Sequence, residues 1–115
     1  MSERIEMWFK EDTVNQIDIH KAKELIDQQD VTIVDIRDDQ SFLEGHIAKA
    51  VQVNDGNIDD FLKNIDKQKT IICYCYHGYS SQAAADLFKE NGFKTVYSLI
   101  GGFEAWKNSY PAKFN

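Results

Sequence analysis

The stretch TIICYCYHGYSS, residues 70–81, contains the pattern that decides the fold. Its first half, TIICYC, is a continuous run of apolar and β-branched side chains, which is typical of a strand buried on both faces. A short loop with a glycine follows, and residues 81–91 then repeat apolar side chains at helical spacing. This predicts a helix with Ala84, Leu87 and Phe88 inward and Gly92 just past its end. A buried strand that passes directly into a helix is the unit of an α/β fold.

The same alternation continues on both sides of this stretch. We expect further strands at 17–19, 31–35, 51–53 and 95–99, and further helices at 21–28, 39–44 and 57–66. Gly45 is placed to end the second of these helices, and Phe103 and Trp106 lie on one side of a last short helix. The predicted fold is therefore a single α/β domain with a mostly parallel five-stranded central sheet and helices on both faces.

The domain is expected to span residues 17–110. An N-terminal arm at 1–16, whose structure the pattern does not define, precedes it, and a C-terminal tail at 111–115 follows. Within the arm, the apolar triplet MWF at 7–9 fits neither period, so it is expected to cover a sheet edge or to pack as a loose arm.

The composition excludes several classes of function. The 115 residues carry a net charge of −6, which argues against a general nucleic-acid or anionic-membrane surface. No apolar run approaches the roughly 20 residues that a membrane helix needs, and the N-terminal MSERIEMWFKEDT contains no apolar signal core. Cys73 and Cys75 are too few and too close for a disulfide framework. These features predict a cytoplasmic protein with reduced thiols.

Cys75 is the candidate nucleophile. In parallel α/β sheets, ligands bind beyond the carboxyl ends of the strands, which directs attention to the segments after Asp35, Cys75 and Leu99. The loop after Cys75 leads into a helix N-terminus, whose free N–H groups attract negative charge and lower the pKa of a thiol. We therefore expect Cys75 to be exposed and rich in thiolate. The alternative, a small cysteine buried in the core, suits the residue type but not this loop.

The loop itself is expected to bind an anion, mainly through backbone N–H groups. The residues predicted to contribute are Tyr76, His77, Gly78, Tyr79, Ser80 and Ser81. Gly78 is expected to adopt a positive φ or to allow a close backbone approach. Ser80 or Ser81 is expected to cap the helix and to donate a hydroxyl hydrogen bond to the bound anion.

Four motifs together point to a known family. They are DIRD at 35–38, EGHI at 44–47, CYHGYSS at 75–81 and GGFEAW at 101–106. In order and spacing they resemble the rhodanese domain over nearly the whole chain. In particular, the chain is similar to the small single-domain GlpE-type sulfurtransferases, whose loop also reads CYHG followed by a serine pair.

This resemblance implies a sulfurtransferase that needs no metal and no organic cofactor. The thiolate of Cys75 would take the outer sulfur of thiosulfate, or of another sulfane donor, and hold it as a persulfide; from thiosulfate, sulfite is released. A thiophilic acceptor would then remove this sulfur. The implied acceptors are cyanide in an assay and a thiol, such as a reduced thioredoxin-like dithiol protein, in a cell. Such a two-step covalent transfer follows a ping-pong scheme.

The loop departs from that of the animal members of the family, which carry basic side chains beside the cysteine. Here the neighbours are Tyr76, His77 and Tyr79, and a mostly neutral histidine adds little charge at pH 7. We therefore expect weak binding of thiosulfate, and a persulfide or polysulfide from another protein is a second candidate donor.

Other polar and small residues near the expected site have structural interpretations. Arg37 is flanked by Asp35 and Asp38, and an ion pair that orders this loop is favoured over an anion-steering charge near the nucleophile. His46 is expected to be packed or to fix a loop. The glycine pair at 101–102 is expected to form a tight turn between a strand and a helix.

Cys73, Cys75 and His77 form a C-x-C-x-H pattern, which would place all three side chains on one face of a strand. Three ligands leave a zinc shell short, so no metal site is predicted. A disulfide between the two cysteines would be strained and is not expected.

The residues suggest three alternative functions. A cysteine phosphatase of the C-x5-R type is not expected, because Ser81 stands six positions after Cys75 and no arginine follows Arg37. A non-catalytic binding module is disfavoured by the intact cysteine loop. A sulfur relay, loaded by another protein's persulfide, uses the same chemistry with different partners.

Overall fold

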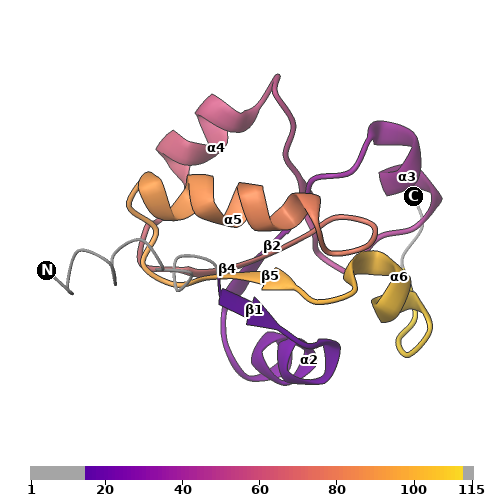
Figure 1. Ribbon diagram of the computed structural model, residues 1–115. Helices are drawn as coiled ribbons and strands as arrows, with labels where there is room; N and C mark the ends of the chain where they lie inside the picture. Colours follow the sequence, from indigo (N-terminus) through magenta and orange to yellow (C-terminus); the bar gives the residue numbers. More distant parts are fainter. Residues whose placement is uncertain (1–14, 113–115) are drawn as a thin grey trace, which may run out of the picture.

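A parallel sheet with helices on both faces makes up the computed structural model, which describes residues 15–112 (Figure 1). The strand order is β1-β5-β4-β2-β3, and every pair of neighbours is parallel, which confirms the expected sheet. The strands are β1 (Asn15–Ile17), β2 (Val31–Asp35), β3 (Val51–Gln52), β4 (Thr70–Tyr74) and β5 (Val96–Leu99). The helices are α2 (Ile19–Gln28), α3 (Asp39–Glu44), α4 (Ile58–Asn64), α5 (Ser80–Glu90) and α6 (Gly102–Lys107).

Two hydrophobic cores lie on opposite faces of the sheet. One contains Ala22 from α2 and Trp106 from α6, and the other contains Phe61 from α4 and Phe88 from α5. In Figure 1, α4 and α5 lie above the sheet and α2 lies below it. Successive side chains of a strand point to opposite faces, so each buried strand contributes to both cores.

Most element positions agree with the expected pattern. The strand at 31–35 and the helix at 39–44 match β2 and α3, and Gly45 ends α3 as predicted. The expected strand at 17–19 is wrong at its end, because Asp18 accepts a hydrogen bond from the Lys21 N–H at 2.8 Å and caps α2, which begins at Ile19. Helix α2 therefore begins with Ile19, a β-branched residue that was expected to end the strand.

One inward-facing side chain was predicted wrongly. Leu87 is 40% exposed, and the buried positions of α5 are Ser81, Ala85 and Phe88. Their spacing of four and three residues is that of one helix face. The face is rotated from the expected one because Ser81 enters the interior beside the cysteine loop.

The N-terminal boundary of the domain differs from the expected one. The sheet begins before the expected domain boundary at residue 17, because Asn15 and Gln16 pair with Tyr97 and Ser98 on β5. The expected arm over the triplet at 7–9 lies outside the described residues. Within residues 15–112, no helix is both long and apolar enough to cross a membrane.

The parallel topology places the carboxyl ends of all strands on one side of the molecule. In Figure 1 this is the side where β2 leads to α3 and β5 leads to α6. The loop after β4 also starts there, so the cysteine at the end of TIICYC lies on the same side of the molecule as the segments that follow β2 and β5.

Candidate active site

Cys75 directly follows β4 and lies under its own loop. Tyr74 is the last residue of β4, and α5 begins five residues after the cysteine, at Ser80. Gly78 has φ 98°, as predicted, and a side chain there would meet Gly101 N at 2.8 Å and Leu99 O at 3.1 Å. The turn therefore requires glycine for its conformation and for its close approach to the backbone after β5.

Three hydrogen-bonding groups surround Cys75 Sγ. The N–H groups of Gly78 and Ser81 donate to the sulfur at 3.1 and 3.3 Å, and Ser81 Oγ lies 3.4 Å away. Burial by itself raises the pKa of Cys75. The hydroxyl of Ser81 and the N–H groups of Ser81, Gly78 and His77 outweigh it and hold that pKa below its ordinary value.

Two expectations about this loop were wrong. Cys75 is only 7% exposed rather than open to solvent, because the loop folds over it. Ser80 and Ser81 do not cap α5, since the residue at the cap position is Tyr79 and its side chain makes no capping hydrogen bond. The sulfur takes that place instead, because it accepts the free Ser81 N–H in the first turn of the helix.

The remaining loop side chains point outward. Tyr79 is 78% exposed, and His77 and Ser80 are exposed. The ring of Tyr76 meets the ring of His77 edge-on, with centroids 4.7 Å apart. The loop thus turns backbone N–H groups toward Cys75 and presents aromatic side chains to solvent.

Helix α6 holds the loop from the other side. The N–H of Phe103 donates to Cys75 O at 2.9 Å, and the N–H of Glu104 donates to Tyr76 O at 3.0 Å. Gly102 makes this contact possible, because a Cβ there would lie 2.5 Å from Cys75 O and 2.6 Å from Tyr76 O. The tight turn expected at the glycine pair is therefore also a docking point for the cysteine loop.

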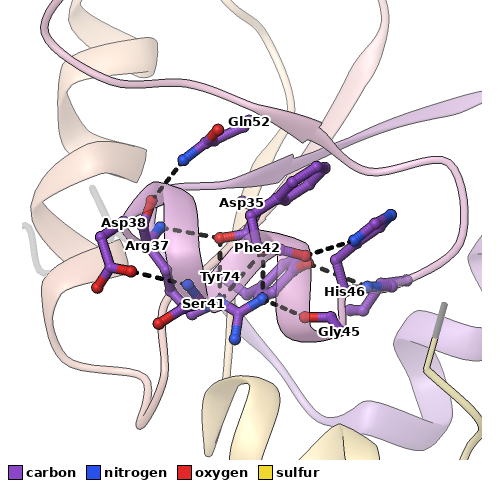
Figure 2. A network of polar contacts seen from close by, with 10 residues as sticks. Asp35, Arg37, Asp38, Ser41, Phe42, Gly45, His46, Gln52 and Tyr74 are labelled. Carbon is purple, nitrogen blue, oxygen red and sulfur yellow. Dashed lines mark hydrogen bonds and ion pairs between the residues drawn. The ribbon is translucent and has the colours of Figure 1, made fainter. Parts of the chain in front are cut away.

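Arg37 forms a buried ion pair after β2 (Figure 2). Its Nη2 lies 2.7 Å from Asp35 Oδ2 and donates to Gly45 O at 2.7 Å, and its Nε donates to both Asp35 oxygens at 3.1 Å. The two side chains are 6% and 0% exposed. Burial lowers the pKa of Arg37, but the hydrogen bonds and charge of Asp35 outweigh burial and raise it. Asp38 caps α3 by accepting the Ser41 N–H at 2.8 Å.

The ion pair reaches the cysteine loop only indirectly. The Arg37 guanidinium lies 4.2 Å from the centre of the Phe103 ring, and the backbone of Phe103 holds the loop. These contacts agree with the favoured interpretation that Arg37 orders the segment after β2. An anion-binding role for Arg37 stays a prediction, although Arg37 lines a cavity of about 490 Å³ together with Tyr76 and Lys107.

His46 is packed, as expected. It is 7% exposed, its Nδ1 lies 2.8 Å from Phe42 O, and its ring stacks on that of Phe42 with centroids 3.9 Å apart (Figure 2). These contacts fix the turn between α3 and the following segment.

The two cysteines and His77 do not share a strand face. Cys73 is fully buried in the core under α5, and β4 ends at Tyr74, so the strand alternation does not extend to His77. Burial raises the pKa of Cys73 to about 12. Both cysteines are free, and only Cys75 has a sulfur surrounded by N–H donors of the loop.

Two side chains at the site were not singled out from the sequence. Lys107 donates a hydrogen bond to the Tyr76 hydroxyl at 2.8 Å and so brings a cation beside the loop. Ser98 is fully buried, and its Oγ lies 2.7 Å from Ser81 Oγ. A polar residue inside the apolar strand VYSL was the available signal for Ser98. No signal in the sequence marked Lys107, which ends the short helix α6.

The fold and the cysteine loop define a class of protein that comparison with known families identifies. The Rhodanese-like domain family model matches residues 18–109, so the chain belongs to this family. Curated relatives include the protein named thiosulfate sulfurtransferase GlpE from Coxiella burnetii strain RSA 331, which is 46% identical over 96 residues. The match covers 84% of this chain and 90% of that protein.

A second relative and a solved structure agree with this assignment. The thiosulfate sulfurtransferase GlpE of Pseudomonas aeruginosa strain LESB58 is 43% identical over 101 residues, covering 88% of this chain and 91% of that protein. The solution structure of a rhodanese-like domain from Anabaena sp. superposes with a TM-score of 0.78 at 28% identity, covering 87% and 79% of the two chains.

Proposed function

We propose that the protein is a thiosulfate sulfurtransferase that carries sulfane sulfur on Cys75 as a persulfide. The observation that supports this most directly is the environment of Cys75 Sγ, which accepts two backbone N–H groups and lies beside the Ser81 hydroxyl. Donors aimed at one sulfur stabilise a thiolate, which is the form that attacks. The names of the relatives support thiosulfate as a donor.

The transfer takes place in two steps. The Cys75 thiolate attacks the outer sulfur of thiosulfate, a sulfur–sulfur bond forms, and the bond between the two thiosulfate sulfurs breaks as sulfite leaves with the electron pair. A thiophilic acceptor then attacks the outer sulfur of the persulfide, and Cys75 leaves as a thiolate. Cyanide gives thiocyanate in this step, and a thiolate from a dithiol protein of the thioredoxin type gives a new persulfide.

The charge around the loop favours a weakly bound donor. The side chains of His77 and Tyr79 are exposed, and the loop contributes backbone N–H dipoles. The positive charge beside the loop is that of Lys107, which donates a hydrogen bond to the Tyr76 hydroxyl. A dianion is therefore attracted mainly by N–H groups. Under this proposal a persulfide from another protein is a competing donor, and a reducing cytoplasm keeps Cys75 available.

The first test is the intact mass of the protein after incubation with thiosulfate and then with cyanide. We expect a gain of about 32 Da on the Cys75 peptide, one sulfur atom, and its removal by cyanide with release of thiocyanate. A gain of mass only from a protein persulfide would identify a sulfur-relay protein instead. If Cys75 is reduced and gains no mass from any donor, the protein is a binding module.

Two serine variants provide the control. Cys75→Ser should fold and lose all transfer, whereas Cys73→Ser should retain it, because Cys73 is a buried core residue. Equal loss in both variants with intact folds would contradict a single nucleophile. The same samples should not hydrolyse p-nitrophenyl phosphate, because a serine occupies the sixth position after Cys75.

A further inference from the structure

A buried hydroxyl group lies behind the serine that contacts the nucleophile. Ser98 is on β5, where it pairs in register with Cys73 of β4, and its side chain is fully buried. Its Oγ lies 2.7 Å from Ser81 Oγ, which in turn lies 3.4 Å from Cys75 Sγ. Two oxygen atoms and one sulfur therefore form a continuous chain that leads from the sheet to the reactive atom.

The number of protons decides the direction of this chain. Each serine hydroxyl has one proton to donate. Within residues 15–112, the Ser98 hydroxyl has no hydrogen-bond partner other than Ser81 Oγ. If Ser81 donated to Ser98, the Ser98 proton would be buried without an acceptor, which is costly in a fully buried site. As a thiol, Cys75 donates its own proton to Ser81 Oγ, but the thiolate has no proton to donate. In the thiolate state, if Ser98 donates to Ser81, both hydroxyl protons find acceptors, because the Ser81 proton then points to the sulfur.

We propose that Ser98 is a positioning residue, whose hydroxyl donates to Ser81 Oγ and thereby directs the Ser81 hydroxyl proton at Cys75 Sγ. The proposal rests on the proposed function in that Cys75 is the nucleophile. When the thiol ionises, its proton leaves to solvent, and the two hydroxyl groups only rotate, so no proton moves between oxygens. A hydroxyl that accepts one hydrogen bond becomes a stronger donor in the next.

This chain of hydrogen bonds acts in both the first and the second step of the sulfur transfer. It stabilises negative charge on Sγ in the free thiolate, and again when an acceptor removes the outer sulfur and Sγ becomes the leaving group. Donors that are already oriented need no rearrangement as this charge develops.

Other titratable groups near the loop do not donate to the sulfur. In the described part of the chain, no charged side chain is hydrogen-bonded to Cys75 Sγ. The titratable side chains of the surrounding elements are Cys73 and Tyr74 on β4, Tyr76, His77 and Tyr79 in the loop, Asp86, Lys89 and Glu90 on α5, Tyr97 on β5, and Glu104 and Lys107 on α6. All of them are retained in the variants below except Cys73, which is itself tested.

The experiment measures the pH dependence of Cys75 alkylation by iodoacetamide, read from the mass of the Cys75 peptide. Alkylation requires only the thiolate, so it succeeds or fails independently of any sulfur donor. The variants are Ser98→Ala and the isosteric pair Ser98→Thr and Ser98→Val, which differ only in the hydroxyl. Ser81→Ala removes the direct donor, and Cys73→Ala removes an equally buried side chain at the paired position of β4.

We expect the pH at the inflection of the alkylation profile to rise by about half a pH unit in Ser98→Ala and Ser98→Val. In Ser81→Ala it should rise by at least as much. Below the inflection this corresponds to roughly threefold slower alkylation at fixed pH. Ser98→Thr and Cys73→Ala should keep the wild-type inflection.

Two results would overturn the proposal. A wild-type inflection in folded Ser98→Ala or Ser98→Val, beside a raised one in Ser81→Ala, would make Ser98 a packing residue only. An equal rise in Cys73→Ala would assign the effect to loosening of the core. Circular dichroism identifies variants that do not fold, and because Ser98→Ala removes a single oxygen atom, it provides the comparison if the larger side chains are rejected.

Discussion

At Cys75, burial and hydrogen bonding act on the thiol in opposite directions. Burial raises the pKa, and donors from Ser81, Gly78 and His77 lower it further than burial raises it. A hydrogen bond to a charged group contributes about 1.5–3 kcal/mol, and one pKa unit corresponds to about 1.4 kcal/mol. Two or three donors are therefore enough to reverse the effect of burial. The reactivity of this residue depends on the loop geometry that keeps them in place.

The lowered pKa predicts that Cys75 ionises at a lower pH than an ordinary cysteine. Its alkylation rate in the folded protein should level off at a lower pH than in the protein unfolded in urea, where a free cysteine titrates near about 8.5. The measurement is the rate of carboxamidomethylation from pH 5 to 10 in both states. Coincident profiles would show that the donors around the sulfur do not stabilise the thiolate.

Gly102 tests the contact between α6 and the loop. Gly102→Ala places a Cβ 2.5 Å from Cys75 O, so we expect lower stability and slower alkylation of Cys75. Gly92→Ala is the matched control: Gly92 also has a positive φ, 95°, but its Cβ would meet only Lys67, at 3.9 Å. Both variants carry a backbone cost of about 1–2 kcal/mol. Only Gly102→Ala should change the reactivity of Cys75, and equal rates in the two variants would refute the docking role.

At the scale of elements, the loop after β2 is organised by a pair of buried charges. Asp35 is fully buried and Arg37 nearly so, and together they join the end of β2 to Gly45 at the end of α3. Truncating one partner of such a pair leaves a charge uncompensated in the interior, which costs more than the pair itself contributes.

The Arg37→Met variant therefore has a large expected cost. It keeps an unbranched apolar stem but removes the guanidinium and leaves the Asp35 charge buried alone, which should lower the free energy of unfolding by about 3–5 kcal/mol. The control is Lys69→Met, which breaks a surface pair with Asp30, whose side chain is 81% exposed, and should cost less than about 1 kcal/mol. Urea unfolding measures both, and similar losses would mean that the Asp35 charge is relieved elsewhere.

For the whole molecule, β4 joins the two cores through adjacent titratable residues. Cys73 lies in the core under α5 and Tyr74 in the opposite core. Burial raises the pKa of Cys73 to about 12 and, together with the charge of Asp35, raises that of Tyr74. Both groups stay protonated in the folded protein at a pH where the unfolded chain releases their protons. Their contribution to stability is present below the unfolded pKa and is lost as pH rises toward the folded one.

The free energy of unfolding should therefore decline above about pH 8.5, the pKa of an unfolded cysteine. Each such group adds a slope of up to about 1.4 kcal/mol per pH unit. Cys73→Ala removes one group, so its decline between pH 8.5 and 10 should be shallower than that of the wild type in urea titrations. Cys75 affects the free energy of unfolding in the opposite direction. Because its pKa is lowered in the folded protein, it stabilises the fold at a pH above its pKa in the unfolded chain. Equal slopes in the two proteins would contradict the assignment to Cys73.

Local pattern predicted much of the fold and part of the site. The apolar run at 31–35 and the helix ended by Gly45 are correct in place and length, because they depend on side chains close together in the chain. Gly78 was assigned correctly for the same reason, as a short turn restricts its own backbone. The predicted capping of the helix by Ser80 or Ser81 was wrong, because the sulfur of Cys75 accepts the Ser81 N–H in the first turn instead.

By itself, the sequence determined the alternation of strands and helices, the resemblance to rhodanese domains and the position of Cys75 at the start of a loop before a helix. These features follow from spacing over a few residues. Only the tertiary structure decided that Cys75 is buried, that α6 holds its loop and that Ser98 stands behind Ser81. Those contacts join residues far apart in the chain, such as Ser81 and Ser98, and they depend on the register of parallel strands and on how closely helices approach them. Periodicity along one segment contains no information about that approach.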